Sequence, residues 1–428
     1  MKILVVGSDY GTVDMVNEAR KCGDYVVVAD YYEETLTKSV ADESWVVSTL
    51  DIDALEDLCR KNGIEAVTFA ASDLNVTNGR QLAKRLGLPC YCSSDVAWGV
   101  ARNKGKFKEI CKKIGAPIAT DYIVSENLTD EELDKITFPV VVKPVDRSAN
   151  RGMSYCDNKD ELRAAYKLAR EISDNPRIIV ERRLYGPEFV ANYVIADGKA
   201  VLNHLSAEHH QPGEKANLYS IINTTSCHLK QYLEELNDYV IKIFEMAEFN
   251  EGIAWVECML DQDGHFYLIE PGFRFCGEMT AVPYGQISGF NGIKWMLDIA
   301  KGVKHTHDQL PPPLTTAHYG SGVSYLLFAH TVDTVERIEG LDVIEKIPNV
   351  VIDIRHRKNF KTRYLGTLGV IRFPAHSEKE LLEYIRIIND NLRVLNAKGE
   401  DLIIHYTDYD SLKEQYELGL KEFGFEIK

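Results

Sequence analysis

Two glutamates that face each other across a predicted β-hairpin are the residues best placed to do chemistry. Two strand-like runs flank Asp263-Gly264, and an Asp-Gly pair in such a setting favours a two-residue turn. In that register Glu257 lies directly opposite Glu270, with Cβ atoms about 4.5–5.5 Å apart. Like charges this close repel each other unless a cation lies between them or one carboxylate stays protonated. An oxygen-only pair suits Mg²⁺, which commonly completes its coordination with water and substrate phosphates.

Two other interpretations of this hairpin need no metal. A register offset by one residue would separate the carboxylates, and a nearby Lys or Arg could pair with one of them. The predicted register also places Met259 opposite Leu268 on the carboxylate face, where the two could form the floor under a nucleotide base or simply pack in the core. If the second strand continues past Gly272, Arg274 falls on this face and could neutralise a phosphate or a carboxylate.

Further charged residues stand at the ends of apolar strands. Lys143 ends the apolar run 139–144, where its charge would be costly without an anionic partner. The small, basic loop that follows contains Ser148, Arg151 and Gly152, whose side chains and backbone could close over phosphates. The P-loop motif G-x-x-x-x-G-K-[ST] does not occur, so any phosphate site here is of another kind.

A second hairpin is predicted to turn at Asp197-Gly198. The segment V-E-R-R-L-Y-G-P-E precedes it, with Glu181 ending one strand and Glu188 starting the next. Exposed backbone at this hinge could pair with an adenine edge, and Glu188 could accept hydrogen bonds from ribose hydroxyls. A solvated acidic loop is the alternative.

Histidine and cysteine give weaker signals. The pairs His209-His210 and His305-x-His307 are spaced somewhat like metal ligands, but we expect them in polar loops with solvated or capping roles. The nine cysteines contain no C-x-x-C and no even framework, which fits a reducing cytosol. No apolar run suits a secretory signal or a membrane span, so we expect a cytoplasmic protein.

Length, charge and patterning predict an α/β and α+β multidomain protein. The chain has 428 residues and a net charge of −16, which permits several domains and disfavours a nucleic-acid-binding surface. Strands at 2–7, 25–30, 64–70 and 89–92 alternate with helical segments, which indicates a Rossmann-like domain over about residues 1–95. Its first turn lacks G-x-G-x-x-G, so a nicotinamide-dependent oxidoreductase is disfavoured and Asp30 is better explained as a loop cap.

The rest of the chain divides into two further parts. Asn103 is a plausible N-cap for a helix from Lys104 to Ile114. Residues 96–305 are expected to form a two-lobed domain with a lid-like subdomain at about 120–190. The three prolines within 309–314 mark a boundary, after which a small α+β unit occupies 306–428.

Taken together, the charged residues occur in an order that resembles the ATP-grasp superfamily. The order is Lys104, V-V-K-P with Lys143, a small-residue loop, V-E-R-R-L-Y-G-P-E, and then V-E … D-G … I-E-P-G-F-R. The resemblance covers about residues 1–305, and the superfamily includes biotin carboxylase, D-alanyl-D-alanine ligases, carbamoyl-phosphate synthetase and L-amino acid ligases. The carboxy-terminal part is most similar to that of the bacterial L-amino acid ligases.

The resemblance implies ATP and Mg²⁺ as cofactors and gives the residues their roles. The two lysines and the 148–152 loop would bind phosphates, Glu188 would bind ribose, and Mg²⁺ would be held by the two opposed glutamates. Adenine would meet Glu181 and the backbone near Leu184. Lys143 and Arg274 would stabilise the reacting groups, with the first domain and the carboxy-terminal unit framing the acceptor site.

The implied reaction joins a small-molecule carboxylate to an amine. The carboxylate attacks the γ-phosphate of ATP to give an acyl phosphate and ADP, and the amine then displaces phosphate to form an amide. Relatives are frequently dimers, so a homodimer is expected. One departure stands out, because the usual motif E-x-N-x-R reads Glu270-Pro271-Gly272-Phe273-Arg274 and lacks the Asn oxygen. A catalytically weak nucleotide-binding module, or a phosphotransferase or carboxylase, therefore stays open as an alternative.

Overall fold

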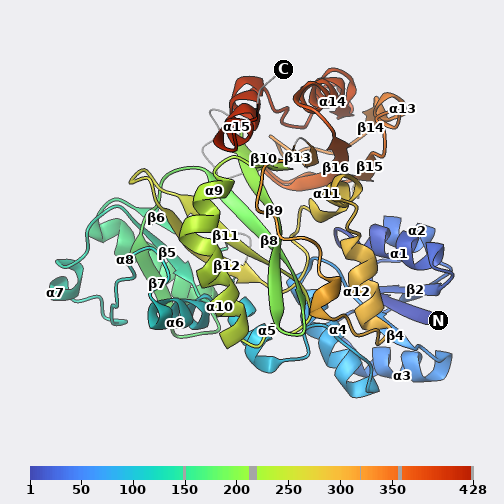
Figure 1. Ribbon diagram of the computed structural model, residues 1–428, viewed down its shortest axis with the longest axis horizontal. Coiled ribbons are helices and arrows are strands. Elements are labelled where there is room, and N and C mark those ends of the chain that lie inside the picture. Colours follow the sequence, from blue (N-terminus) through green and yellow to red (C-terminus); the bar gives the residue numbers. More distant parts are fainter. Residues whose placement is uncertain (148–150, 212–218, 319, 355–358, 426–428) are drawn as a thin grey trace.

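The computed structural model describes residues 1–147, 151–211, 219–318, 320–354 and 359–425. It is a mixed α/β structure with four separate sheets (Figure 1). Within the described residues, no helix combines the length and the apolar character that crossing a membrane would require.

The first part of the chain forms a four-stranded parallel sheet in the order β3-β2-β1-β4. Its two central strands are buried runs of Val, Ile, Leu and Ala, as expected of a sheet covered on both faces. The strands are β1 (Lys2–Val6), β2 (Tyr25–Asp30), β3 (Glu43–Val46) and β4 (Ala66–Thr68). The helices are α1 (Thr12–Lys21), α2 (Leu36–Val40), α3 (Ile52–Asn62) and α4 (Asp73–Leu86).

Local details of this unit agree with some predictions and correct another. Gly7 and Gly11 have φ values of 85° and 90°, and an Asp30 carboxylate oxygen accepts a hydrogen bond from the Tyr32 amide at 2.9 Å. The interpretation of Asp30 as a loop cap is thus confirmed. The strand predicted at 89–92 is wrong, because these residues form a turn between α4 and α5 (Asp95–Arg102).

A small lobe follows, built on a three-stranded antiparallel sheet in the order β6-β5-β7. As predicted, Asn103 caps α6 by accepting a hydrogen bond from the Lys106 amide. Gly115 follows the last helical residue at φ 71°. The strands are β5 (Val140–Pro144), β6 (Ser154–Cys156) and β7 (Ile178–Arg182), and the helices are α6 (Lys104–Ile114), α7 (Asp130–Leu133) and α8 (Lys159–Ile172).

An eight-stranded antiparallel sheet forms the centre of the molecule, in the order β12-β11-β8-β9-β10-β13-β16-β15. Its last three strands come from the carboxy-terminal part, so the predicted boundary near residue 306 does not interrupt the sheet. The strands are β8 (Glu188–Ala196), β9 (Lys199–His210), β10 (Tyr219–Thr224), β11 (Gly252–Leu260), β12 (Phe266–Gly272), β13 (Ser321–Phe328), β15 (Val351–Ile354) and β16 (Thr367–Ala375).

Helices and a short ribbon cover this sheet. Figure 1 shows the first unit (blue) on one side of the central sheet, the small lobe on the other, and the carboxy-terminal helices above. The helical elements are α9 (Leu229–Tyr232), η1 (Leu233–Asn237), α10 (Asp238–Met246), α11 (Ala281–Ser288), α12 (Gly292–Ala300), η2 (His307–Gln309), α13 (Leu341–Ile344), α14 (Glu378–Asn391) and α15 (Tyr409–Glu422), and the ribbon pairs β14 (Arg337–Glu339) with β17 (Arg393–Leu395).

The two hairpins that carry the predicted site differ in their turns. Asp197 and Gly198 form the two-residue loop between β8 and β9, with φ values of 49° and 68°, as predicted. Between β11 and β12 the predicted two-residue loop is wrong, because the pairing begins at Leu260 and Phe266 and leaves five residues in the loop. A bulge then restores the predicted register deeper in the ribbon.

Candidate active site

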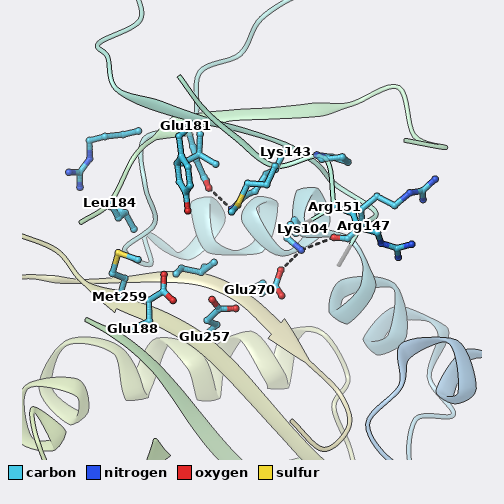
Figure 2. A pocket seen from close by; sticks show the side chains of 16 residues that line it. Lys104, Lys143, Arg147, Arg151, Glu181, Leu184, Glu188, Glu257, Met259 and Glu270 are labelled. Carbon is cyan, nitrogen blue, oxygen red and sulfur yellow. Dashed lines mark hydrogen bonds and ion pairs between the residues drawn. The ribbon is translucent and has the colours of Figure 1, made fainter. Parts of the chain in front are cut away.

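A cavity of about 120 Å³ lies between the small lobe and the central sheet. Figure 2 shows Lys143 and Glu181 on the lobe side, facing Glu188, Glu257 and Glu270 on the strands of the central sheet. Nine of the predicted site residues line this cavity: Lys104, Lys143, Arg151, Glu181, Leu184, Glu188, Glu257, Met259 and Glu270. Segments more than 160 positions apart in the chain therefore meet at one site, as the order of motifs predicted.

The opposed carboxylates are the central feature of the cavity. Glu257 on β11 pairs with Glu270 on β12, as predicted. Burial, and next the charge of Glu270, raise the pKa of Glu257 well above its ordinary value. Glu270 forms an ion pair with Lys104, whose ammonium also donates a hydrogen bond to the Arg147 carbonyl at 3.2 Å. The metal-free alternative, in which a lysine pairs with one carboxylate, is thus realised at Glu270, while burial and neighbouring like charge keep the pKa of Glu257 high.

A buried charge network holds the lobe side of the cavity. Glu181 accepts from Lys143 and from Lys108, each N–O distance being 2.5 Å. Burial opposes ionisation of Glu181, but the two lysines outweigh it and lower its pKa to about 2. Burial likewise opposes the charge of Lys143, but Glu181 raises the pKa of that ammonium. The lysine therefore has the anionic partner that its position demanded, and it stays charged at the cavity wall.

The bulge in β12 changes which apolar residues reach the cavity. Cys258 pairs with Leu268 and Met259 pairs with Tyr267, so the predicted pairing of Met259 with Leu268 is wrong. Leu268 is buried in the core, whereas Ile269, the extra residue between the two registers, lines the cavity with Met259. A bulge adds one residue to one strand, so every side chain beyond it pairs one position further along the partner strand.

The basic loop after β5 is only partly placed. Ser148 lies outside the described residues. Arg151 lines the cavity, while Gly152 is not among the lining residues and adopts a φ of 76°. A Cβ there would lie 2.2 Å from a side-chain carbon of Ile172, so the loop needs glycine at this point for both conformation and space.

A larger cavity of about 800 Å³ adjoins the carboxylates on the side of the first unit. Arg274 lines it and donates to Asp73, the first residue of α4, with an Nε–Oδ1 distance of 2.6 Å. Arg102 forms a second ion pair with Asp73. The sequence predicted Arg274 here, but it gave no sign of Asp73, because that contact joins residues 201 positions apart.

Gly272, which stands where the usual motif has Asn, is explained by its cross-strand neighbour. It pairs with Trp255 on β11. A Cβ at position 272 would lie 2.1 Å from an indole carbon of Trp255, so any larger residue would collide with that ring. The indole NH of Trp255 has no hydrogen-bond partner among the described residues, and Trp255 lines the larger cavity. An aromatic side chain has thus taken the space of the missing amide.

The histidine pair in the second hairpin was placed incorrectly by the sequence. His209 and His210 lie at the end of strand β9, not in a polar loop. His209 is buried, its Nε2 lies 2.7 Å from the Asn223 side-chain oxygen, and burial lowers its pKa to about 4. His210 points to the opposite face, beside Glu188 and Glu208.

With this geometry established, the chain can be placed among known proteins. Residues 136–282 match the family model of the ATP-grasp domain. The chain contains an ATP-grasp domain. The match spans the lobe strand β5, the hinge before β8, both hairpins and the carboxylate pair.

Curated enzymes are similar to less than half of this chain. It is 27% identical over 186 residues to a formate-dependent phosphoribosylglycinamide formyltransferase from Wolinella succinogenes, covering 42% of this chain and 47% of the relative. It is 27% identical over 210 residues to a D-alanine–D-alanine ligase from Streptococcus thermophilus, covering 44% and 57% respectively. The chain thus spans only about half the length of the relatives that it matches.

Solved structures resemble the ATP-grasp chain over almost its whole length. An L-amino acid ligase from Bacillus licheniformis is 19% identical, with a TM-score of 0.72 over 95% of this chain and 99% of that one. A biotin carboxylase from Campylobacter jejuni is 16% identical, with a TM-score of 0.72 over 99% and 97%. At such identities the likeness concerns the fold.

Proposed function

We propose that this protein is an ATP-dependent ligase that joins a carboxylate to an amine and releases ADP and phosphate. The observation that carries this proposal is the pair Glu257 and Glu270, opposed in register beside charged Lys143 at a cavity of an ATP-grasp domain. A sheet gains nothing from facing carboxylates unless a positively charged partner joins them.

ATP would lie in the cavity between the small lobe and the central sheet. Lys104 and Lys143 would bind its phosphates, and the 148–152 loop with Arg151 would cover them. The hinge at Glu181 and Leu184 would meet adenine, with Met259 beneath the base and Glu188 at the ribose. Glu181 contributes indirectly as well, because its ion pair keeps Lys143 charged.

The carboxylate pair fits Mg²⁺ by its donor chemistry. Both side chains offer hard oxygen atoms. Burial and the charges of Glu270 and Glu188 raise the pKa of Glu257, so a bound cation would favour its charged form. When bound, Mg²⁺ would neutralise charge on the phosphates. Glu270 also contacts Lys104, so the carboxylate and the ammonium together would fix the phosphate end of the nucleotide.

The larger cavity would hold the reacting carboxylate and the amine. An oxygen of the substrate carboxylate attacks the γ-phosphorus of ATP. The bond between that phosphorus and the ADP oxygen breaks, and an acyl phosphate and ADP result. The amine then attacks the acyl carbon, phosphate leaves, and the amine loses a proton. Arg274, held by Asp73, would bind the acyl phosphate and the charge that develops on the carbonyl oxygen. Positioning and charge neutralisation suffice, and no side-chain nucleophile is needed.

The finer organisation belongs to the same proposal. The parallel-sheet unit of residues 1–95 would act as a Rossmann-like domain preceding the ATP-grasp domain of about 96–305, and residues 306–428 as a carboxy-terminal unit that helps to frame the acceptor site. The substrates would be small molecules, the protein would work in the cytoplasm as a homodimer, and nucleic acid would not be a partner.

The decisive experiment measures phosphate and ADP release with MgATP over pairs of amino acids and small carboxylates. We expect one pair to stimulate release, and Glu270→Gln to reduce the stimulated rate by at least about 100-fold, since it removes a carboxylate ligand of the Mg²⁺ that would neutralise the phosphates. Glu109→Gln is the matched control, because Glu109 is 67% exposed and, among the residues that the structure describes, pairs with Arg177 alone.

Three outcomes would contradict parts of this proposal. Undiminished turnover in Glu270→Gln would remove that carboxylate from metal binding. Release that requires bicarbonate would indicate a carboxylase. Tight MgATP binding with no release under any acceptor mixture would indicate a nucleotide-binding module without catalysis.

A further inference from the structure

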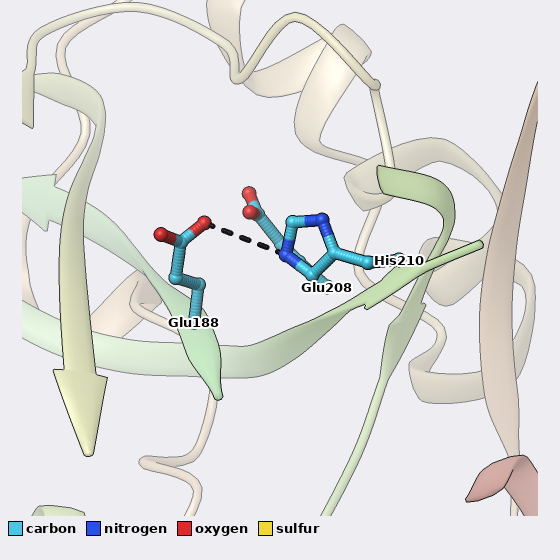
Figure 3. A group of neighbouring side chains, drawn as sticks. All are labelled: Glu188, Glu208 and His210. Atoms are coloured by element: carbon cyan, nitrogen blue, oxygen red, sulfur yellow. Dashed lines mark ion pairs between the residues drawn. The ribbon is translucent and has the colours of Figure 1, made fainter. Parts of the chain in front are cut away.

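Glu188, Glu208 and His210 form a cluster beside the larger cavity, which the two glutamates line. Figure 3 shows the two carboxylates and the imidazole directed toward one another from strands β8 and β9. One potential ligand atom from each side chain lies within 4.8 Å of the others, and Nε2 of His210 is 3.8 Å from a Glu188 oxygen. The cluster is therefore compact enough to bind a single small cation.

Strand register explains why these residues meet. Phe189 pairs with Ala207 and Val190 with Ser206, so the next step along the ribbon sets Glu188 opposite Glu208. His210 follows two positions later and so shares the face of Glu208. A shift in register near Asn192 produces this arrangement. Without that bulge the Asp197-Gly198 turn would set Glu188 opposite Ala207, which is why the sequence did not indicate the cluster.

The burial and pairing of Glu208 indicate a proton or a cation at its carboxylate. It is only 7% exposed, and one of its carboxylate oxygens has no hydrogen-bond partner among the described residues. In the same part of the chain it forms no ion pair with Lys or Arg. Burial, and next the charges of Glu188 and Glu257, raise its pKa well above the ordinary value. A buried carboxylate beside another carboxylate must bind either a proton or a cation.

We propose that Glu188, Glu208 and His210 bind a divalent transition-metal ion such as Zn²⁺ or Co²⁺, at a site separate from the Glu257 and Glu270 pair. A neutral imidazole nitrogen with carboxylate oxygens suits these ions, whereas Mg²⁺ prefers oxygen alone. Bonds of about 2.0–2.2 Å bring ligand atoms within about 4.4 Å of one another, so small side-chain rotations would close the site. The larger cavity leaves room for water or a substrate group as a further ligand.

The site would link the two cavities. Glu188 lines both of them, whereas Glu208 lines only the larger one among the two. A metal ion here would place positive charge between the nucleotide and the acceptor region. The carboxylates of Glu188, Glu208 and Glu257 lie around that position and would attract the ion. An anionic or lone-pair group of a bound substrate could then complete the coordination.

Titration of the full, tag-free chain with Co²⁺ tests this proposal without nucleotide or Mg²⁺. We expect one Co²⁺ per chain, with visible bands typical of nitrogen and oxygen ligands. Glu208→Gln and His210→Gln should each weaken binding at least about 10-fold. Glu257→Gln should keep the site, because that residue belongs to the other pair. An unfolding curve for each variant confirms that it is folded. We expect Glu208→Gln to fold, because it removes repulsion between buried carboxylates.

The results separate this proposal from the proposed ligase activity. Absence of bound Co²⁺, a spectrum dominated by thiolate charge transfer, or unchanged affinity in both Glu208→Gln and His210→Gln would overturn the metal site. Loss of Co²⁺ binding in Glu257→Gln would also overturn it, because the ion would then occupy the opposed pair. Neither nucleotide nor acceptor is present, so a negative result leaves the ligase proposal untouched.

Discussion

Glu181 is a buried carboxylate that stays charged because two lysines contact it. Its carboxylate lies between Lys108 and Lys143, and all three side chains are buried. We expect Glu181→Gln to lower the free energy of unfolding by about 3–5 kcal/mol at pH 7, because two buried ammonium groups would lose their counter-charge. Urea denaturation measures this change, and Glu109→Gln at the surface should change the free energy by less than about 1 kcal/mol.

The pH dependence of the same variant gives a second test. The pKa of Glu181 is about 2 in the folded protein, below its unfolded value, so its ionisation stabilises the fold above the unfolded pKa. That contribution is lost as the pH falls from about 4.5 toward 2. The difference between the original protein and Glu181→Gln should therefore shrink in acid. A difference that stays constant down to pH 3 would contradict the ion-pair account.

For single residues, the sequence indicated which side chains belong to the site better than it indicated which partners they contact. Lys143 was expected to need an anion because it ends an apolar strand, and Glu181 supplies it. Lys108 was not predicted, although it lies four positions after Lys104 and so on the same face of α6. Asp73 could not have been found from spacing, since only tertiary packing brings α4 to Arg274.

At the scale of strands, turn residues predict a hairpin but not the bulges that follow. Both hairpins exist, although only Asp197-Gly198 is a two-residue turn, and Glu257 opposes Glu270 as expected. The intermediate pairings differ, because each ribbon contains a register shift. Bulges arise from twist and packing against neighbouring strands, and no residue type marks them in one sequence. This explains both the misplaced Leu268 and the unpredicted contact of Glu208 with Glu188.

Gly272 gives a prediction that belongs to the β11–β12 ribbon. Gly272→Asn would restore the usual motif but would drive the new side chain into the Trp255 indole. We expect it to lower the free energy of unfolding by about 1–3 kcal/mol, the usual cost of overpacking a well-filled site. Combining it with Trp255→Ala should recover part of that loss, because the ring that causes the collision is gone. Urea denaturation of both single variants and the double variant measures the coupling.

The single variants test whether the Trp255 indole is what excludes a side chain at position 272. If Gly272→Asn alone unfolds no more easily than the original protein, the indole is not what excludes a side chain at this position. Trp255→Ala by itself is the control, since it opens the cavity without adding an amide.

At the scale of the whole molecule, the order of segments was predicted better than their boundaries. A parallel sheet near the amino terminus, a β-rich centre and a carboxy-terminal part with strands and helices are all present. The proline-rich segment near 311–313 was expected to separate units, yet β13, β15 and β16 continue the central sheet beyond it. A run of prolines indicates an extended segment of chain. Which sheet the later strands join is decided by hydrogen bonds to strands far away in the sequence, and composition does not show these.

An ion pair between the first unit and the central sheet gives the last prediction. Arg372 on β16 is fully buried, and its Nη1 lies 2.7 Å from Oδ2 of Asp14 on α1. The contact is close but not aligned as a hydrogen bond, and Arg372 has no other hydrogen-bond partner among the described residues. Asp14→Leu would leave an uncompensated guanidinium in the interior, so we expect it to lower the free energy of unfolding by about 3–5 kcal/mol, measured by urea denaturation.

Adding Arg372→Met to this variant should recover most of that loss, because apolar packing replaces the buried pair at little net cost. Equal destabilisation in the single and double variants would show that the two side chains act independently, and that the first unit and the central sheet are not held together through this pair.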